Sequence, residues 1–324
     1  MNTFPHRIVA VCLGAAALCV PPSAASADYP TRPIRVITPF PPGSATDVIA
    51  RLLSEPVSRS LGQPVIVDNR PGADGAIAAA AVAHAEPDGY TLLMATSGPM
   101  AGLPAMKKNL PYNPRTDFSP VADVGRFSIF LWTSPQLPAK TVTELIAYAR
   151  ANPNKLNYAT GNVTGIASAA QLLSLSGTQM VHVPYKGEPA AVADLVAGRV
   201  HLMFASPANA APLAREGKLR AMAFALSRRS PAFPDVPTMA ESGMPGFSLV
   251  SWTAVFAPAR LPADIAARLN QAFAAAMRQP EVVEAADKQQ FLLTPSTPQQ
   301  LGVFLDEQIE IYGKMLREAG IQPE

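Results

Sequence analysis

The stretch IRVITPFPPGSATDVIARLLSEPV, residues 34–57, decides the fold. Its β-branched start, residues 34–38, predicts a strand that stops at the proline- and glycine-containing turn of residues 39–43. Apolar residues then recur at helical spacing, so a helix follows the turn directly, and Pro56 is expected to kink it. A strand that turns at once into a helix is the repeating unit of α/β domains.

The same alternation continues on the C-terminal side of this stretch. Strands are expected at 64–67 and 90–94, with an alanine-rich helix at about 74–85 between them. A second unit begins near Val121, and its expected strands are 127–132, 156–159, 181–183, 200–204 and 219–224, with helices at about 141–150, 165–176 and 188–198. Two further helices start at Pro262 and cover about 298–318. This order predicts an α/β fold with mainly parallel sheets.

Composition fits a globular protein of two lobes. The chain has 324 residues, of which 48% are hydrophobic and 15% charged, and this balance excludes a disordered or fibrous chain. Two apolar runs, 121–131 and 249–256, are interpreted as crossings between lobes. We therefore expect lobe 1 to comprise residues 28–125 with 250–324 and lobe 2 residues 126–249, with the ligand in the cleft between them.

Segment 1–27 has the three parts of a secretory signal peptide. A polar start with Arg7 precedes an apolar run from Ile8 to Val20, and Ala25-Ser26-Ala27 forms a cleavage site. The apolar run is shorter than the roughly 20 residues that span a bilayer. No later stretch is long and apolar enough for a membrane helix. We expect cleavage after Ala27 and a soluble periplasmic protein.

Cysteine positions and net charge exclude several classes of function. Cys12 and Cys19 both lie in the signal segment, so the mature chain is expected to have no disulfide, no thiolate nucleophile and no cysteine-ligated metal. The chain carries 26 basic and 24 acidic residues, which provide no strong field for nucleic acid. No metal or other cofactor is expected.

Enzyme motifs are absent from the sequence. It contains no G-x-S-x-G, H-E-x-x-H, phosphate-loop or dinucleotide-binding pattern, and its mature histidines, His84, His182 and His201, are too far apart for a local metal motif. A secreted hydrolase would need a nucleophile and a base from distant segments, for example Ser97 or Ser168 with His182. That reading stays an alternative to a binding function.

Two loops between a strand and a helix are candidate anion sites. In residues 41–47 the pair Ser44 and Asp47 fits a capping box, and residues 158–165 supply hydroxyl and amide groups before a second helix. A helix start offers free backbone N–H groups and the positive end of the helix dipole, which suit a carboxylate or phosphate. Asp47 is assigned to capping and loop shape, because its charge would repel an anion.

A series of motifs running in order from about Tyr29 to the C-terminus resembles the Bug family. The motifs are Pro39-Phe40-Pro41-Pro42-Gly43 with Thr46-Asp47, Asp68-Asn69-Arg70-Pro71-Gly72-Ala73, Pro87-Asp88-Gly89-Tyr90-Thr91-Leu92-Leu93, Asp117-Phe118, Val183-Pro184-Tyr185-Lys186-Gly187, Gly217-Lys218-Leu219-Arg220-Ala221, Pro234-Asp235-Val236-Pro237-Thr238-Met239-Ala240-Glu241, Trp252 and Phe256-Ala257-Pro258. The resemblance implies a periplasmic substrate-binding protein of a tripartite tricarboxylate transporter, with a two-lobed Venus-flytrap α/β fold and no catalysis. It also implies a small carboxylate ligand and membrane transporter components as partners.

The resemblance places the ligand at the loops 40–47 and 160–165. The expected ligand-binding residues are Phe40, Pro42, Gly43, Ser44, Ala45, Thr46, Asp47, Ser97, Thr160, Gly161, Asn162, Thr164, Gly165 and Ser206. Ser44, Val163 and Asp74 stand where the family usually has glycine, and dicarboxylates, aromatic carboxylates and amino acids all remain open as ligands. We expect a monomer. A module that presents its closed form to a membrane sensor shares every one of these features.

Some conspicuous residues have two interpretations. Arg70 and Lys186 either pair with an anionic ligand or fix a loop, and Trp132 and Trp252 either wall the cleft or belong to the core.

Overall fold

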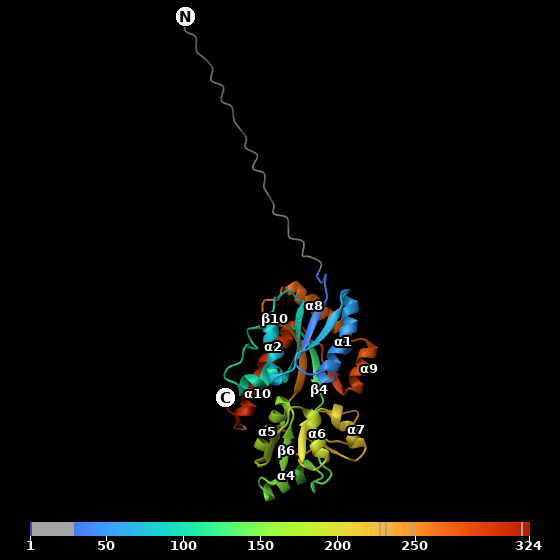
Figure 1. Ribbon diagram of the computed structural model, residues 1–324, viewed down its shortest axis with the longest axis vertical. Helices are drawn as coiled ribbons and strands as arrows, with labels where there is room; N and C mark the ends of the chain where they lie inside the picture. Colours follow the sequence, from blue (N-terminus) through green and yellow to red (C-terminus); the bar gives the residue numbers. More distant parts are fainter. Residues whose placement is uncertain (2–28, 227, 231, 248, 319) are drawn as a thin grey trace.

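The computed structural model describes Met1 and residues 29–324, apart from 227, 231, 248 and 319. Two α/β lobes lie one beyond the other along the long axis of the molecule (Figure 1). Apart from Met1, the predicted signal peptide falls outside the described residues. None of the helices in the described part is long and apolar enough to cross a membrane.

Lobe 1 is built on a six-stranded sheet with the strand order β11-β4-β10-β3-β1-β2. Its strands are β1 (Ile34–Thr38), β2 (Val65–Asn69), β3 (Thr91–Thr96), β4 (Phe118–Phe127), β10 (Ser251–Pro258) and β11 (Phe291–Leu293). Its helical elements are α1 (Ala45–Leu61), η1 (Ala73–Gly75), α2 (Ala76–Ala83), η2 (Gly98–Gly102), α3 (Leu103–Met106), α8 (Ala263–Ala276), α9 (Pro280–Lys288) and α10 (Pro298–Glu318).

Lobe 2 is built on a five-stranded sheet with the strand order β7-β6-β8-β5-β9. Its strands are β5 (Phe130–Thr133), β6 (Asn157–Thr160), β7 (Val181–Pro184), β8 (Leu202–Ala205) and β9 (Arg220–Phe224). Its helices are α4 (Val142–Ala151), α5 (Val163–Ser176), α6 (Glu188–Val196) and α7 (Pro207–Arg215).

Both sheets are mixed, so the prediction of mainly parallel sheets was wrong. The pairs β1–β2, β1–β3, β6–β7 and β6–β8 are parallel, as strand–helix–strand units require. However, β10 runs antiparallel to β3 and β4, and β5 runs antiparallel to β8 and β9. The chain enters lobe 2 through β5 and returns to lobe 1 through β10, and within lobe 1 β11 also pairs antiparallel with β4.

The predicted strand 127–132 was also wrong as a single element. Phe127 is the last residue of β4 in lobe 1, whereas Phe130 is the first residue of β5 in lobe 2, so the chain changes sheets between them. Pro56 lies inside α1, which continues to Leu61, and the kink expected there stays a prediction. Sequence analysis did not identify η2, α3, α7, α9 and β11.

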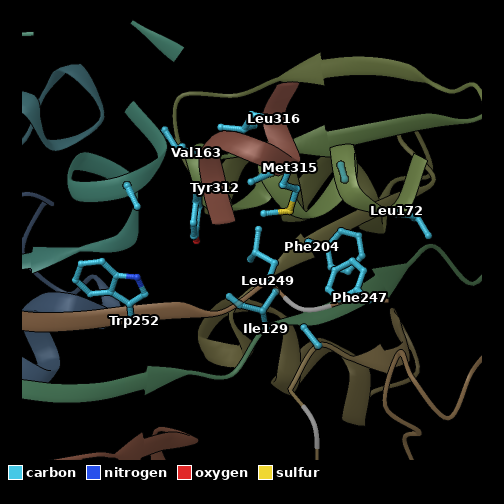
Figure 2. Close-up of a cluster of buried hydrophobic side chains, with 14 of the residues drawn as sticks. Ile129, Val163, Leu172, Phe204, Phe247, Leu249, Trp252, Tyr312, Met315 and Leu316 are labelled. Carbon is cyan, nitrogen blue, oxygen red and sulfur yellow. The ribbon is translucent and has the colours of Figure 1, made fainter. Parts of the chain in front are cut away.

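The hydrophobic core links the lobes instead of dividing at their boundary. One cluster of buried residues contains side chains of both sheets, and α10 packs against α5 of lobe 2 although α10 follows β11 of lobe 1. Figure 2 shows Tyr312, Met315 and Leu316 of α10 gathered with Val163 and Phe204 of lobe 2. The C-terminal helix therefore ties lobe 1 to lobe 2.

Candidate functional site in the cleft between the lobes

The turn between β1 and α1 presents a capped helix start. Ser44 is extended (φ −67°, ψ 157°) and its Oγ accepts a hydrogen bond from the Asp47 N–H at 3.3 Å. Gly43 has φ 80°, a backbone conformation that favours glycine. Within the described part of the chain, the N–H groups of Ala45 and Thr46 have no hydrogen-bond partner. These two donors, at the positive end of α1, can bind an anion.

The carboxylate of Asp47 is used to shape this turn. It accepts hydrogen bonds from the Gly43 N–H at 2.9 Å, Asn69 Nδ2 at 2.9 Å and Arg51 Nε at 3.0 Å. Burial alone would raise the pKa of Asp47, but hydrogen bonds from Arg51, Gly43 and Asn69 outweigh it and hold the pKa below its usual value. The charge is thus compensated within lobe 1, so it opposes a bound anion less than a free carboxylate would.

Asn69, which sequence analysis did not single out, holds the turn from the neighbouring strand. It ends β2 beside β1, and its Nδ2 donates to Thr38 Oγ1 at 2.7 Å and to the Phe40 carbonyl at 3.0 Å, as well as to Asp47. The available signal was its position at the carboxyl end of a strand next to β1, the edge at which ligands bind in α/β sheets.

The second predicted loop lies between β6 and α5 in lobe 2. Asn162 caps α5, and its Oδ1 accepts a hydrogen bond from the Gly165 N–H at 2.8 Å. In the described part of the chain, the N–H groups of Val163 and Thr164 are left without a partner. Thr160 is buried and its Oγ1 lies 2.7 Å from His182 Nε2, so it supports the loop from within the lobe.

Ser97 and Thr164 meet across the lobe boundary. Ser97 follows β3 of lobe 1, and its Oγ lies 3.2 Å from Oγ1 of Thr164, which belongs to α5. Tyr312 joins them from α10: burial raises the pKa of its hydroxyl to about 12, and hydrogen bonds with Ser97 and Thr164 act against this rise. Two predicted site residues from different lobes are therefore in contact.

Ala45 and Ser206 share one small hollow between the lobes. Ser206 is the residue before α7, so the starts of α1 and α7 face the same space. The hollow is lined by Ala45, Ile49, Phe127, Ser128, Ser206, Pro207, Ala208, Gln289 and Phe291.

Glu188, the first residue of α6, is a second residue that sequence analysis missed. Its carboxylate accepts hydrogen bonds from Asn162 Nδ2 at 3.0 Å and from Ser206 Oγ at 2.8 Å. Burial raises the pKa of Glu188, and the hydrogen bonds from Ser206 and Asn162 only partly offset this. One carboxylate thus connects two predicted ligand-binding residues of lobe 2.

The remaining predicted residues differ in burial and in bonding. Pro42 and Gly43 are exposed at the tip of the first turn, whereas Thr46 is buried. The Phe40 carbonyl is bound by Asn69. Gly165 is buried, and its N–H donates to Asn162 Oδ1 at the start of α5.

The geometry does not favour a hydrolase. Ser97 Oγ contacts Thr164 Oγ1 and Ser168 Oγ donates to the Thr164 carbonyl at 2.8 Å. The ring of His182 bonds to Thr160 and stacks on Tyr158, and burial lowers its pKa. Among the described residues, neither serine is hydrogen-bonded to this histidine.

Other conspicuous residues are explained by structural roles. Arg70 pairs with Asp68, and Trp132 and Trp252 are fully buried, with Trp132 Nε1 bonded to the Ala205 carbonyl at 3.1 Å. Lys186 is exposed in the turn before α6. No group of three or more His, Cys, Asp or Glu residues in the described ranges is arranged to hold a metal ion.

Comparison with known proteins identifies the family. The model of the tripartite tricarboxylate transporter family receptor, TctC, matches residues 49–321. Protein BugT of Bordetella pertussis is 37% identical over 319 residues, which are 97% of this chain and 96% of BugT.

Solved structures agree with this result. A Rhodopseudomonas palustris protein with adipate is 34% identical, with a TM-score of 0.85 over 92% of this chain and 100% of that one. MatC from the same species, with bound malate, is 35% identical, with a TM-score of 0.80 over 89% of this chain and 100% of MatC. This chain therefore belongs to the tripartite tricarboxylate transporter family receptors, a family of two-lobed periplasmic solute-binding proteins.

Proposed function

We propose that the protein captures a small carboxylate-containing ligand in the cleft between its lobes and delivers it to the membrane components of a tripartite tricarboxylate transporter. The observation that carries the proposal is the start of α1, where the N–H groups of Ala45 and Thr46 have no partner among the described residues and Ala45 lines a hollow together with Ser206 of lobe 2. The adipate and malate held by the two solved relatives support a carboxylate as the ligand.

In this proposal the ligand carboxylate binds at the start of α1, and lobe 2 orients the rest of the molecule. We propose that the lobes comprise residues 28–125 with 250–324 and residues 126–249, except that residues 126–127 end β4 and belong to lobe 1. Ser97 and Thr164, already in contact, lie where the lobes meet over the ligand. Ligand that binds both lobes favours the closed form, and we propose that this form is what the transporter recognises.

We also propose that the protein acts in the periplasm and carries out no reaction on its ligand. The chain is exported, cleaved after Ala27 and active in the periplasm as a monomer. No bond of the ligand is made or broken, since the serine and histidine side chains that a hydrolase would need contact other groups.

Thermal unfolding tests whether a carboxylate binds. The protein is stripped of carried-over ligand by unfolding and refolding, then heated with dicarboxylates, aromatic carboxylates and amino acids. A ligand at about 100 times its dissociation constant adds roughly 2.7 kcal/mol to the free energy of unfolding. Stabilisation by members of one carboxylate class supports the proposal, and no stabilisation by any of them contradicts it.

The variant Ala45→Pro tests where the carboxylate binds. Ala45 is the first residue of α1, where proline fits the helix, and extended Ser44 suits the position before proline. The variant removes one ligand-facing N–H, so titration calorimetry should show a loss of about 1.5–3 kcal/mol, or about 10- to 150-fold in affinity.

A matched control separates this effect from the substitution itself. Ala263→Pro places proline at the same position of α8, at an exposed residue of a helix that lies at the end of lobe 1 away from lobe 2 (Figure 1). Both variants should keep the wild-type unfolding temperature, and Ala263→Pro should keep the wild-type affinity. Unchanged affinity in Ala45→Pro would show that α1 does not hold the ligand.

A further inference from the structure

A single carboxylate lies at the starts of three helices in lobe 2. Glu188 opens α6, and its carboxylate is bound by Asn162, which caps α5, and by Ser206, which precedes α7. Besides the Asn162 amide and the Ser206 hydroxyl, the Ser206 backbone N–H points to Oε1 at 3.4 Å. Glu188 thus uses donors that otherwise suit an anionic ligand.

The backbone around Gly161 is packed so that Glu188 reaches these partners. A Cβ atom at Gly161 would lie 2.5 Å from the Glu188 backbone nitrogen and 2.6 Å from the Gly187 carbonyl carbon. Only a residue without a side chain allows the β6–α5 loop to approach the start of α6 this closely. The loop and the glutamate therefore form one packed unit on the lobe 2 side of the cleft.

The charge of this carboxylate is compensated differently from that of Asp47 in lobe 1. Asp47 is paired with the guanidinium of Arg51, with Nε 3.0 Å from Oδ1. The three recorded hydrogen bonds to Glu188 come from neutral groups, and burial raises the pKa of its carboxyl. Among the described residues, a negative charge in this position is held by neutral hydrogen-bond donors and not by an ion pair.

The two sides of the cleft consequently suit different chemical groups. Lobe 1 offers the unpartnered N–H groups of Ala45 and Thr46 beside a compensated carboxylate. In lobe 2, Asn162 and Ser206 donate hydrogen bonds to the carboxylate of Glu188. Ser206 also lines the hollow that Ala45 lines. A second ligand carboxylate near Glu188 would meet a like charge, whereas an ammonium or amide N–H would meet an acceptor.

We propose that Glu188 sets the ligand selectivity of this protein, favouring a molecule with one carboxylate and a cationic or hydrogen-bond-donating far end over a dicarboxylate. The inference rests on the proposed function, because it requires that a carboxylate bind at α1. In this arrangement the ligand carboxylate lies at Ala45 and Thr46, and the far end lies toward Glu188.

The test compares ligand pairs of matched length by titration calorimetry. The pairs are succinate with γ-aminobutyrate, glutarate with δ-aminovalerate, and adipate with ε-aminocaproate. In each pair one carboxylate is replaced by an aminomethyl group. The wild-type protein should bind the amino member of its best pair at least about tenfold more tightly than the dicarboxylate, a difference of about 1.4 kcal/mol.

The variant Glu188→Gln keeps the shape and removes the charge. It should lower the ratio of the two affinities by about tenfold or more, and a ratio measured within one variant does not depend on how much of the sample is folded. Glu216→Gln, a surface glutamate of lobe 2 paired with Lys218, is the control and should keep the wild-type ratio.

The outcomes distinguish this inference from the proposed function. A wild-type protein that prefers the dicarboxylate in its best pair, or an unchanged ratio in Glu188→Gln, overturns the role of Glu188 and leaves carboxylate capture standing. If neither member of any pair binds and the wider carboxylate panel gives no stabilisation, the proposed function fails and the inference fails with it.

Discussion

The contact between Gly102 and Val163 allows a direct test of how the lobes fit together. Gly102 is the last residue of η2 and directly precedes α3 in lobe 1, and Val163 is the first residue of α5 in lobe 2. A Cβ atom at Gly102 would overlap Cγ1 of Val163 and would lie 3.6 Å from the Tyr312 ring. The backbone of Gly102 is helical (φ −74°, ψ −53°), so alanine is strained there by packing and not by its dihedral angles.

The variant Gly102→Ala should separate the lobes at this contact. Overpacking of a filled core costs about 1–3 kcal/mol. For a chain of about 300 residues, this lowers the unfolding midpoint by about 2–5 °C. If the strain acts wholly on the closed form, ligand affinity also falls by about 5- to 150-fold. Thermal unfolding and titration calorimetry measure the two effects.

A second substitution decides whether the contact is the cause. Val163→Ala removes Cγ1 and Cγ2 and alone costs about 1.6 kcal/mol, at about 0.8 kcal/mol for each buried carbon group. Because it also makes room for the new methyl group, the double variant should be more stable than the sum of the two single effects predicts. Simple additivity of the two losses, or a Gly102→Ala variant with wild-type stability and affinity, would refute the reasoning.

Two further predictions concern single side chains of the site. Asn69→Ala removes the hydrogen-bond donor to Thr38, Phe40 and Asp47. It should weaken ligand binding and lower the free energy of unfolding in urea by about 1–3 kcal/mol. Wild-type affinity would show that the β1–α1 turn does not need this residue. Burial in the folded state raises the pKa of Glu188, so the folded protein binds the proton of this carboxyl more tightly than the unfolded chain does. The free energy of unfolding should therefore fall as the pH rises from the ordinary glutamate pKa to the raised one. Glu188→Gln should remove that part of the pH dependence in unfolding measured across pH, and an identical profile in both proteins would contradict the assignment.

The local pattern of the sequence was sufficient for the fold class and for the first turn of the site. The strand, the turn and the capped helix at residues 34–57 are consecutive, so their periodicity and the pair Ser44 and Asp47 can be read directly. The sequence could not give the direction of β10 or β5, because antiparallel pairing with β3 or β8 depends on where the chain crosses between lobes.

The contacts that complete the site join residues distant in the sequence, so the local sequence pattern could not predict them. Asn69 bonds to Asp47 across 22 positions, and Glu188 bonds to Asn162 across 26. The local pattern does not show either partner: Asn69 acquires its role only when β1 and β2 pair, and Glu188 only when the loop before α5 packs against the start of α6. In the same way, the contact of Ser97 with Thr164 exists only because α5 lies against lobe 1.

The measurement that tests carboxylate capture most directly is amide NMR of the stripped protein during titration with the carboxylate that stabilises it most. The account predicts that the backbone N–H resonances of Ala45 and Thr46 shift strongly as they bond to the ligand, while those at the start of α8 do not move. Saturable binding that leaves the resonances of Ala45 and Thr46 unchanged would contradict it.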